Sequence, residues 1–147
     1  MRFPPDIEEL ATQVISLYTR EDKKICTAES CTGGLIAAAI TSVAGSSAVL
    51  ERGFVSYSHE SKTEILGVLP EKIERFGIVS GEIAEEMAQG GLDFSQADVA
   101  LSITGIAGPD GGTNDTPVGL VYLGVATREG AQFHLQCNFS GTRDQIR

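Results

Sequence analysis

One stretch of sequence decides the fold: Lys24-Ile25-Cys26-Thr27-Ala28-Glu29-Ser30-Cys31-Thr32-Gly33-Gly34. Its first half, from Lys24 to Ala28, is short and rich in small or apolar side chains, which predicts a central β-strand. The alanine-rich residues 33–43 are apolar on most faces and predict a helix that is buried, or packed against a sheet and a partner subunit. A strand that leads directly into a helix is typical of open α/β sheets, where ligands bind at the carboxyl ends of the strands.

The segments on either side of this stretch extend the same pattern. Residues 6–21 have apolar side chains at i, i+3 and i+4, which predicts an amphipathic helix starting just after Pro4-Pro5. Further helices are predicted over 60–66, 70–76 and 81–92, the last with Ser80 as its N-cap. Strands are predicted over 52–57, 98–103, 118–127 and 131–139, the last two forming a hairpin. This alternation predicts an α/β protein, a three-layer α/β/α sandwich with a mixed, mostly parallel sheet.

Composition narrows the function classes. The 147 residues include 11 Lys and Arg against 20 Asp and Glu, a net charge of −9, which argues against a basic face for nucleic acid. No apolar run approaches the roughly 20 residues of a membrane span, and the N-terminus lacks the apolar core of a signal peptide. Three cysteines without a Cys-x-x-Cys pair and two histidines argue against a disulfide scaffold or a metal centre. We therefore expect one cytoplasmic domain over 1–147, with no metal, nucleic acid or membrane partner.

The junction between the first strand and its helix carries the first candidate for chemistry. Ser30 or Cys31 at this position can act as a nucleophile, with its oxyanion stabilised by the free N–H groups of the helix start. The alternative is a plain N-cap, for which Ser and Thr are favoured residues, and spacing alone favours that alternative. Neither Gly-x-Ser-x-Gly nor a phosphate-binding Gly-x-x-x-x-Gly-Lys motif is present.

Three further segments supply polar groups. Tyr57 ends the strand at 52–57 and Lys62 lies in the next helix, so a desolvated Lys62 could act as a general base beside a tyrosine hydroxyl. The loop 105–117 contains four glycines that permit a close approach of ligand to backbone, next to Thr104. Arg143 follows the last strand and could bind an anion. Each has a plainer interpretation: a surface lysine with a strand-end tyrosine, a flexible turn, and a solvated tail residue.

Taken in order, these segments resemble one family. The motifs are residues 28–34, Gly45-Ser46-Ser47, residues 53–58, Lys62, residues 104–112, Pro117-Val118-Gly119 and Phe139-Ser140-Gly141 followed by Arg143. Over residues 6–147 the chain resembles the CinA C-terminal domain family, the bacterial nicotinamide-nucleotide amidases. The resemblance implies an α/β/α sandwich that hydrolyses nicotinamide mononucleotide to nicotinate mononucleotide and ammonia. It also implies a homo-oligomer, commonly a dimer, that needs no cofactor.

The resemblance also implies residue roles. Ser30 matches the family's nucleophile, Lys62 its base and Tyr57 the hydroxyl partner of that base, so the Ser30 proton passes to Lys62 directly or through Tyr57. The helix start at 33–43 would supply oxyanion donors. The expected substrate-binding residues are Glu29, Thr32, Gly33, Ser47, Thr104, Gly105 and Arg143, with the role of Glu29 unassigned.

The sequence departs from the family at both ends. Family members usually continue past Arg147 into a C-terminal helix, so we expect the amidase domain here to lack that helix and to expose a sheet face. We also expect the N-terminal pyrophosphatase-like domain of longer members to be absent. Two rival functions stay open at this point: an amidase that uses Cys31 as its nucleophile, and a catalytically silent nucleotide-binding regulatory module of the same fold.

Overall fold

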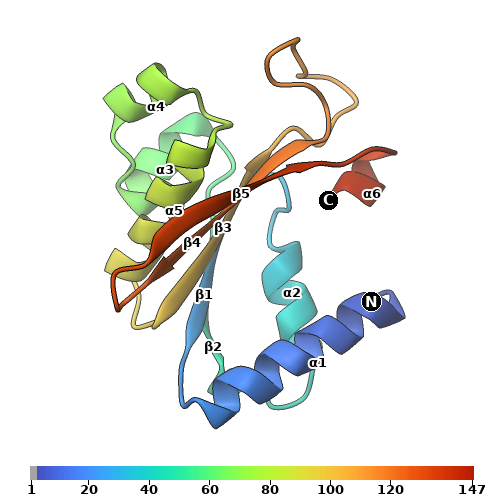
Figure 1. Cartoon of the computed structure of the whole chain (residues 1–147), viewed down its shortest axis with the longest axis vertical. Coiled ribbons are helices and arrows are strands. Elements are labelled where there is room, and N and C mark those ends of the chain that lie inside the picture. The colour runs from blue at the N-terminus through green and yellow to red at the C-terminus, as the bar shows by residue number, and fades with distance from the viewer. Residues whose placement is uncertain (1–2) are drawn as a thin grey trace.

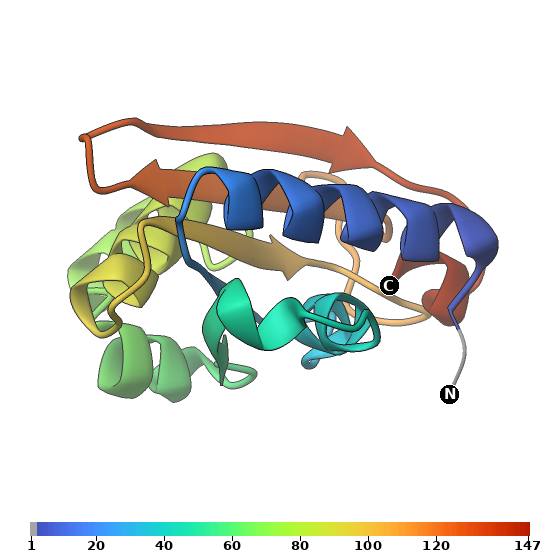
Figure 2. The ribbon, with the colours of Figure 1, turned by 90° about the horizontal axis from the view of Figure 1, so that it is seen from below.

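The computed structural model describes residues 3–147 and places a five-stranded sheet between two helical layers (Figure 1, Figure 2). In chain order the elements are α1 (Pro5–Arg20), β1 (Ile25–Glu29), α2 (Leu35–Thr41), the 3-10 turn η1 (Ser46–Ala48), β2 (Leu50–Val55), α3 (His59–Leu66), α4 (Pro70–Phe76), α5 (Gly81–Asp93), β3 (Val99–Gly105), β4 (Leu120–Thr127), β5 (Gln132–Asn138) and α6 (Arg143–Ile146). The predicted helices and strands are all present, with ends that differ by about two residues. The short helix α6 was not predicted, because four residues are too few to show a helical period.

The strands lie in the order β2-β1-β3-β4-β5. β1 pairs in parallel with both β2 and β3, whereas β3–β4 and β4–β5 are antiparallel. The sheet is mixed, as predicted. It has two parallel and two antiparallel strand pairs, so parallel pairs are not in the majority. The reason is the loop 106–119: it contains no crossover helix, and β4 therefore returns beside β3 in the opposite direction.

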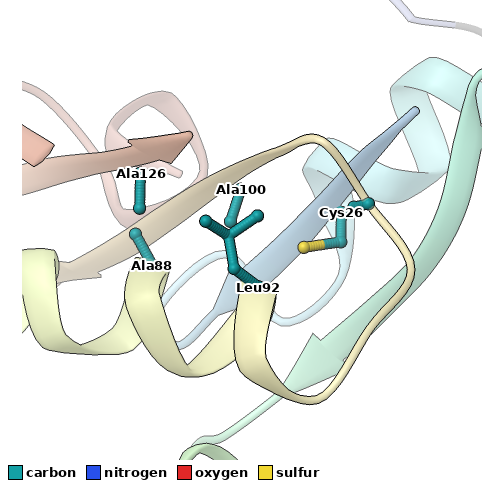
Figure 3. Close-up of a cluster of buried hydrophobic side chains, with 6 residues drawn as sticks. Cys26, Ala88, Leu92, Ala100 and Ala126 are labelled. Carbon is teal, nitrogen blue, oxygen red and sulfur yellow. The ribbon is translucent and has the colours of Figure 1, made fainter. Parts of the chain in front are cut away.

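The predicted three layers are present. Figure 1 shows α1 and α2 on one side of the sheet and α3, α4 and α5 on the other. On the second side, α5 packs against the sheet through small side chains, which let the helix come close. This cluster contains Cys26, Ala88, Leu92, Ala97, Ala100 and Ala126, each at most 1% exposed (Figure 3).

The first side has a different character. An apolar groove of about 550 Å³ lies between α1, α2 and the sheet, lined by side chains such as Leu10, Ile36 and Val125. That the domain lacks the terminal helix of the family stays a prediction. In residues 3–147, no helix combines the length and apolar character needed to cross a membrane.

The three parallel strands determine where polar groups gather. In the sheet register, Glu29 at the end of β1 is level with Val55 of β2 and Ile103 of β3. The residues that follow these three, Ser30, Ser56 and Thr104, therefore lie at the same end of the sheet, where the parallel strands have their carboxyl ends. Two hydrogen bonds hold the ends of these strands together: Ser56 N–H donates to the Glu29 carbonyl at 2.8 Å, and Ser30 N–H donates to the Ile103 carbonyl at 3.1 Å.

Candidate active site

A cavity of about 230 Å³ opens at this end of the sheet, beyond the carboxyl ends of the parallel strands. Six of the predicted site residues line it: Ser30, Tyr57, Lys62, Thr104, Gly105 and Arg143. They come from four separate parts of the chain, namely the end of β1, the β2–α3 connection with α3, the end of β3, and α6. The structure thus brings together residues that the sequence could place only one by one.

Lys62 reaches the cavity from helix α3. Ser58 caps α3 by accepting from Ser61 N–H at 3.1 Å, and Lys62 lies one turn further along, only 1% exposed. Its Nζ donates to the Ser30 hydroxyl oxygen at 3.1 Å and to the Ser56 carbonyl at 2.9 Å. Burial lowers the pKa of Lys62, because an ammonium ion loses its hydration there. A buried lysine that favours its neutral form, in contact with a serine hydroxyl, is suited to remove the serine proton.

Cys31 is the neighbour of Ser30 and also lines the cavity. Burial raises the pKa of the Cys31 thiol, and the backbone N–H groups of Cys31 and Thr32, together with the positive charge of Lys62, oppose that rise only in part. The thiol therefore favours its protonated, weakly nucleophilic form. Lys62 hydrogen-bonds to Ser30, which makes Ser30 the better placed nucleophile of the two.

Tyr57 and Arg143 form the exposed side of the cavity. Arg143 Nη2 donates to the Tyr57 hydroxyl at 3.0 Å, and Arg143 Nη1 donates to the Gly108 carbonyl at 2.7 Å. Arg143 opens α6 next to its N-cap Thr142, which forms a capping box with Gln145. Because Lys62 already contacts Ser30, the Tyr57 hydroxyl is not needed between them. The geometry favours the direct route of the two proton routes expected from the sequence.

Glu29 does not line the cavity. Its side chain is fully buried, and its carboxylate accepts four hydrogen bonds, from Thr32 Oγ1 at 2.6 Å and from the N–H groups of Gly34, Ile36 and Ala37 at 2.9–3.1 Å. A carboxylate in this position satisfies the free N–H groups of the start of α2 and interacts favourably with its dipole. The expected substrate contact of Glu29 is therefore replaced by a structural one, which also occupies the Thr32 hydroxyl.

The same contacts change the expected source of oxyanion donors. The N–H groups of Gly34, Ile36 and Ala37 bind Glu29, and those of Gly33 and Leu35 donate to the carbonyls of Ser30 and Thr32. The helix start predicted to hold the oxyanion is thus already used. Cys31, the residue directly after Ser30, lines the cavity instead.

Two other predicted substrate contacts lie outside the cavity. Gly33 has a φ of 59°, a left-handed conformation that glycine adopts without strain, and it serves the turn between Ser30 and α2. Ser47 lies in η1, before β2 begins, whereas the cavity lies beyond the end of β2. A six-residue strand separates them by about 20 Å. Within one chain, Ser47 therefore does not reach a ligand in this cavity.

Sequence reasoning missed several residues of the site. The Ser56 carbonyl that holds Lys62 is a backbone group, which no motif reveals. His59 and Asp110 also line the cavity. Arg147 donates to the carbonyls of Cys31 and Thr32 at 3.1 and 3.3 Å, and its spacing of four from Arg143 was the available signal. Among residues 3–147 no group of three or more His, Cys, Asp or Glu side chains could hold a metal ion.

Known proteins share this arrangement of chain. The crystal structure of the competence/damage inducible protein CihA from Agrobacterium tumefaciens superimposes with a TM-score of 0.96 at 48% identity, covering 99% of this chain and 89% of that one. The nicotinamide-nucleotide amidohydrolase PncC of Escherichia coli K12 is 46% identical over 142 residues, which are 97% of this chain and 86% of that protein.

Longer relatives match over a part of their length. A putative competence-damage inducible protein of Caldicellulosiruptor saccharolyticus is 49% identical over 142 residues, and the chain spans about a third of its length (34%). The model of the CinA C-terminal domain matches residues 7–147. Sequence, fold and family model agree, and the chain belongs to the CinA C-terminal domain family.

Proposed function

We propose that the protein hydrolyses the carboxamide of nicotinamide mononucleotide to nicotinate mononucleotide and ammonia. The observation that carries this proposal is the contact between Lys62 Nζ and Ser30 Oγ, 3.1 Å apart and almost fully buried. Relatives that are 46% identical and named nicotinamide-nucleotide amidohydrolase, from Escherichia coli and Enterobacter agglomerans, support the choice of substrate. The cavity opens to solvent at the exposed Tyr57, so a small nucleotide can enter.

The reaction follows from the Ser30–Lys62 pair. Neutral Lys62 accepts the Ser30 proton while Ser30 Oγ attacks the carboxamide carbon and forms a tetrahedral oxyanion. Collapse of this intermediate breaks the C–N bond, and Lys62 returns the proton to the leaving nitrogen, which departs as ammonia. Water then attacks the acyl-Ser30 ester with Lys62 again as base, releasing the carboxylate product and restoring the Ser30 hydroxyl.

The developing oxyanion needs donors in a site of low polarity. The N–H groups of Cys31 and Thr32 belong to the turn that begins at Ser30 (the nucleophile turn), where Cys31 lines the cavity, and we propose them for this role. Each such donor contributes on the order of 3–4 kcal/mol to transition-state stabilisation in comparable hydrolases.

Other lining residues of the cavity are available to bind the rest of the substrate. Arg143 places a permanent positive charge there, beside Thr104 and the backbone of Gly105, and a guanidinium is suited to a phosphate group. We propose that these three residues hold the phosphate and ribose of the nucleotide. The net charge of −9 makes this local cation the more important for binding an anionic substrate.

The deciding experiment is an assay of ammonia release from nicotinamide mononucleotide, with free nicotinamide and NAD as controls. The silent regulatory module predicts binding of the mononucleotide without ammonia, even at high protein concentration. Retention of a buried lysine against a serine hydroxyl favours the amidase, since a binding module needs neither group. A homodimer and a location in the cytoplasm stay predictions, the first to be tested by analytical ultracentrifugation.

A further inference from the structure

We infer that Arg147 is a positioning residue for this reaction, one that holds the peptide groups directly after the nucleophile. The inference rests on the proposed function of the same cavity. Arg147 Nε donates to the Cys31 carbonyl at 3.1 Å and Arg147 Nη2 donates to the Thr32 carbonyl at 3.3 Å. One guanidinium thus bridges two successive carbonyls of the turn that begins at Ser30.

The backbone that carries Arg147 is itself held in place. Ile146 is 7% exposed and packs in one buried cluster with Cys31, Ile103, Ala107 and Val121. At the other end of α6, the side chain of Thr142 accepts from Gln145 N–H while the side chain of Gln145 accepts from Thr142 N–H. The backbone of Arg147 is therefore fixed, so ordering its guanidinium against the nucleophile turn has a low entropic cost.

The planarity of the peptide group gives this contact a direction. The Cys31 carbonyl and the Thr32 N–H belong to one planar unit and point opposite ways. When Arg147 binds the carbonyl, the Thr32 N–H must point away from the guanidinium. That N–H is one of the two groups proposed above as oxyanion donors, next to Cys31, which lines the cavity. Arg147 thereby orients the Thr32 N–H, one of the two donors proposed for the oxyanion, and its charge polarises the peptide group that it binds.

The two arginines of α6 have different tasks. Arg143 lines the cavity and contacts the Gly108 carbonyl and the Tyr57 hydroxyl, so its loss affects the substrate directly. Arg147 does not line the cavity, and its guanidinium donates to two backbone carbonyls of the nucleophile turn. Its effect should appear in the chemical step, because the oxyanion exists only after Ser30 has attacked.

The chain offers a matched control in Arg128. Its guanidinium also binds backbone carbonyls: Nε donates to Ala97 at 2.8 Å, and Nη2 donates to Leu92 at 2.7 Å and Ser95 at 2.8 Å. These carbonyls precede β3 and lie at the end of the sheet opposite the cavity. Arg128→Ala therefore removes the same kind of contact without touching the nucleophile turn.

The experiment compares Arg147→Ala, Arg147→Lys, Arg128→Ala and Gln145→Ala in ammonia release and thermal unfolding. For Arg147→Ala we expect kcat about 10²-fold lower with KM within about threefold, the pattern of a lost transition-state contact. Arg147→Lys should recover part of kcat, since an ammonium group keeps the charge but cannot bridge both carbonyls. Arg128→Ala should lower Tm with kcat unchanged. Gln145→Ala removes one hydrogen bond of the capping box but leaves Ile146 buried, so it should lower kcat far less than Arg147→Ala does.

Two results would overturn the inference. One is an Arg147→Ala variant that loses Tm as Arg128→Ala does and keeps its kcat, since Arg147 would then serve stability alone. The other is an equal loss of kcat in Gln145→Ala, since the order of α6 and not the guanidinium would then be responsible.

A second readout separates this inference from the proposed substrate. If the wild-type protein releases no ammonia from nicotinamide mononucleotide, the proposed function fails. Arg147 is then tested by the rate at which an alkyl fluorophosphonate labels Ser30, followed by intact mass. In that step the Ser30 Oγ–P bond forms, fluoride leaves and the Ser30 proton passes to Lys62. We expect labelling about tenfold or more slower in Arg147→Ala, with Ser30→Ala as the blank. Equal rates in wild type and Arg147→Ala overturn the inference.

Discussion

Lys62 Nζ lies 3.1 Å from Ser30 Oγ, although 32 positions of sequence separate the two residues. The two residues meet because β1 and β2 run in parallel and end at the same end of the sheet. Ser30 follows β1, and the connection to α3 follows β2. Lys62 is tied on its other side to the Ser56 carbonyl at 2.9 Å, so its ε-nitrogen cannot turn out to solvent without losing both contacts.

The assignment of the nucleophile is tested by Ser30→Ala and Cys31→Ala. Removing the Ser30 hydroxyl should lower kcat by at least about 10³-fold, as loss of a nucleophile does in other hydrolases. Cys31→Ala keeps the backbone N–H groups and should stay within about tenfold of wild type, with some loss of stability from the removed buried sulfur. The measurement is ammonia release. Near-normal turnover by Ser30→Ala would make Cys31 the nucleophile.

Lys62 should determine the pH dependence of activity. Burial lowers its pKa, so turnover should rise with pH as Lys62 loses its proton at a pH below the ordinary lysine value. Lys62→Arg keeps a positive charge that does not titrate in this range, and it should reduce kcat by about 10²-fold or more. A pH–rate profile of kcat for wild type and Lys62→Arg checks this. An acidic limb that is identical in both proteins would exclude Lys62 as its source.

The same group should make stability depend on pH. With its folded pKa lowered, Lys62 binds a proton more readily in the unfolded chain, so the free energy of unfolding should rise with pH up to the unfolded lysine pKa. Lys62→Met removes this contribution. Urea unfolding at several pH values between about 7 and 10 should show a steeper rise for wild type than for Lys62→Met. Parallel slopes would mean that Lys62 keeps an ordinary pKa in the folded protein.

Tyr57→Phe distinguishes a hydroxyl that supports Arg143 from one that relays protons. Because Arg143 Nη2 binds this hydroxyl and Lys62 contacts Ser30 without it, we expect kcat to fall by less than about tenfold, against about 10²-fold or more for a lost proton-transfer group. KM should rise modestly as Arg143 loses a partner. Steady-state kinetics with Arg143→Ala as the comparison, in which KM should rise more, give the answer. A drop of kcat to the level of a Lys62 variant would restore the relay.

Glu29→Gln should be a stability variant. The Glu29 carboxylate accepts four hydrogen bonds in full burial, and an amide would turn an NH₂ group toward donors. We expect a loss of about 2–4 kcal/mol in the free energy of unfolding, against about 1 kcal/mol for Ser80→Ala, a cap with one such bond. Urea unfolding measures both. A Glu29→Gln protein as stable as wild type but with a raised KM would return Glu29 to the substrate site.

Sequence patterns carried much of the fold. The i, i+3, i+4 spacing of residues 6–21 and the Ser80 cap gave α1 and α5, and the three layers followed from alternation of strands and helices. Patterning could not show that β4 returns antiparallel to β3, because that depends on where the long loop 106–119 leads the chain. It could not show α6 either, since that helix is held by its capping box and by the burial of Ile146.

By itself the sequence indicated the candidate residues for chemistry: Ser30 after a strand, Lys62 in the next helix, and Arg143 after the last strand, in motifs that resemble one family. Tertiary structure alone decided what each of them contacts. The parallel register brought Lys62 to Ser30, burial lowered the pKa of Lys62, and α6 placed Arg143 on Tyr57 and Arg147 behind Cys31. It also decided that the Glu29 carboxylate binds N–H groups at the start of α2 and does not lie in the expected substrate site. The physical reason is that hydrogen bonds and desolvation act over a few ångströms in space, between groups that the sequence holds many residues apart.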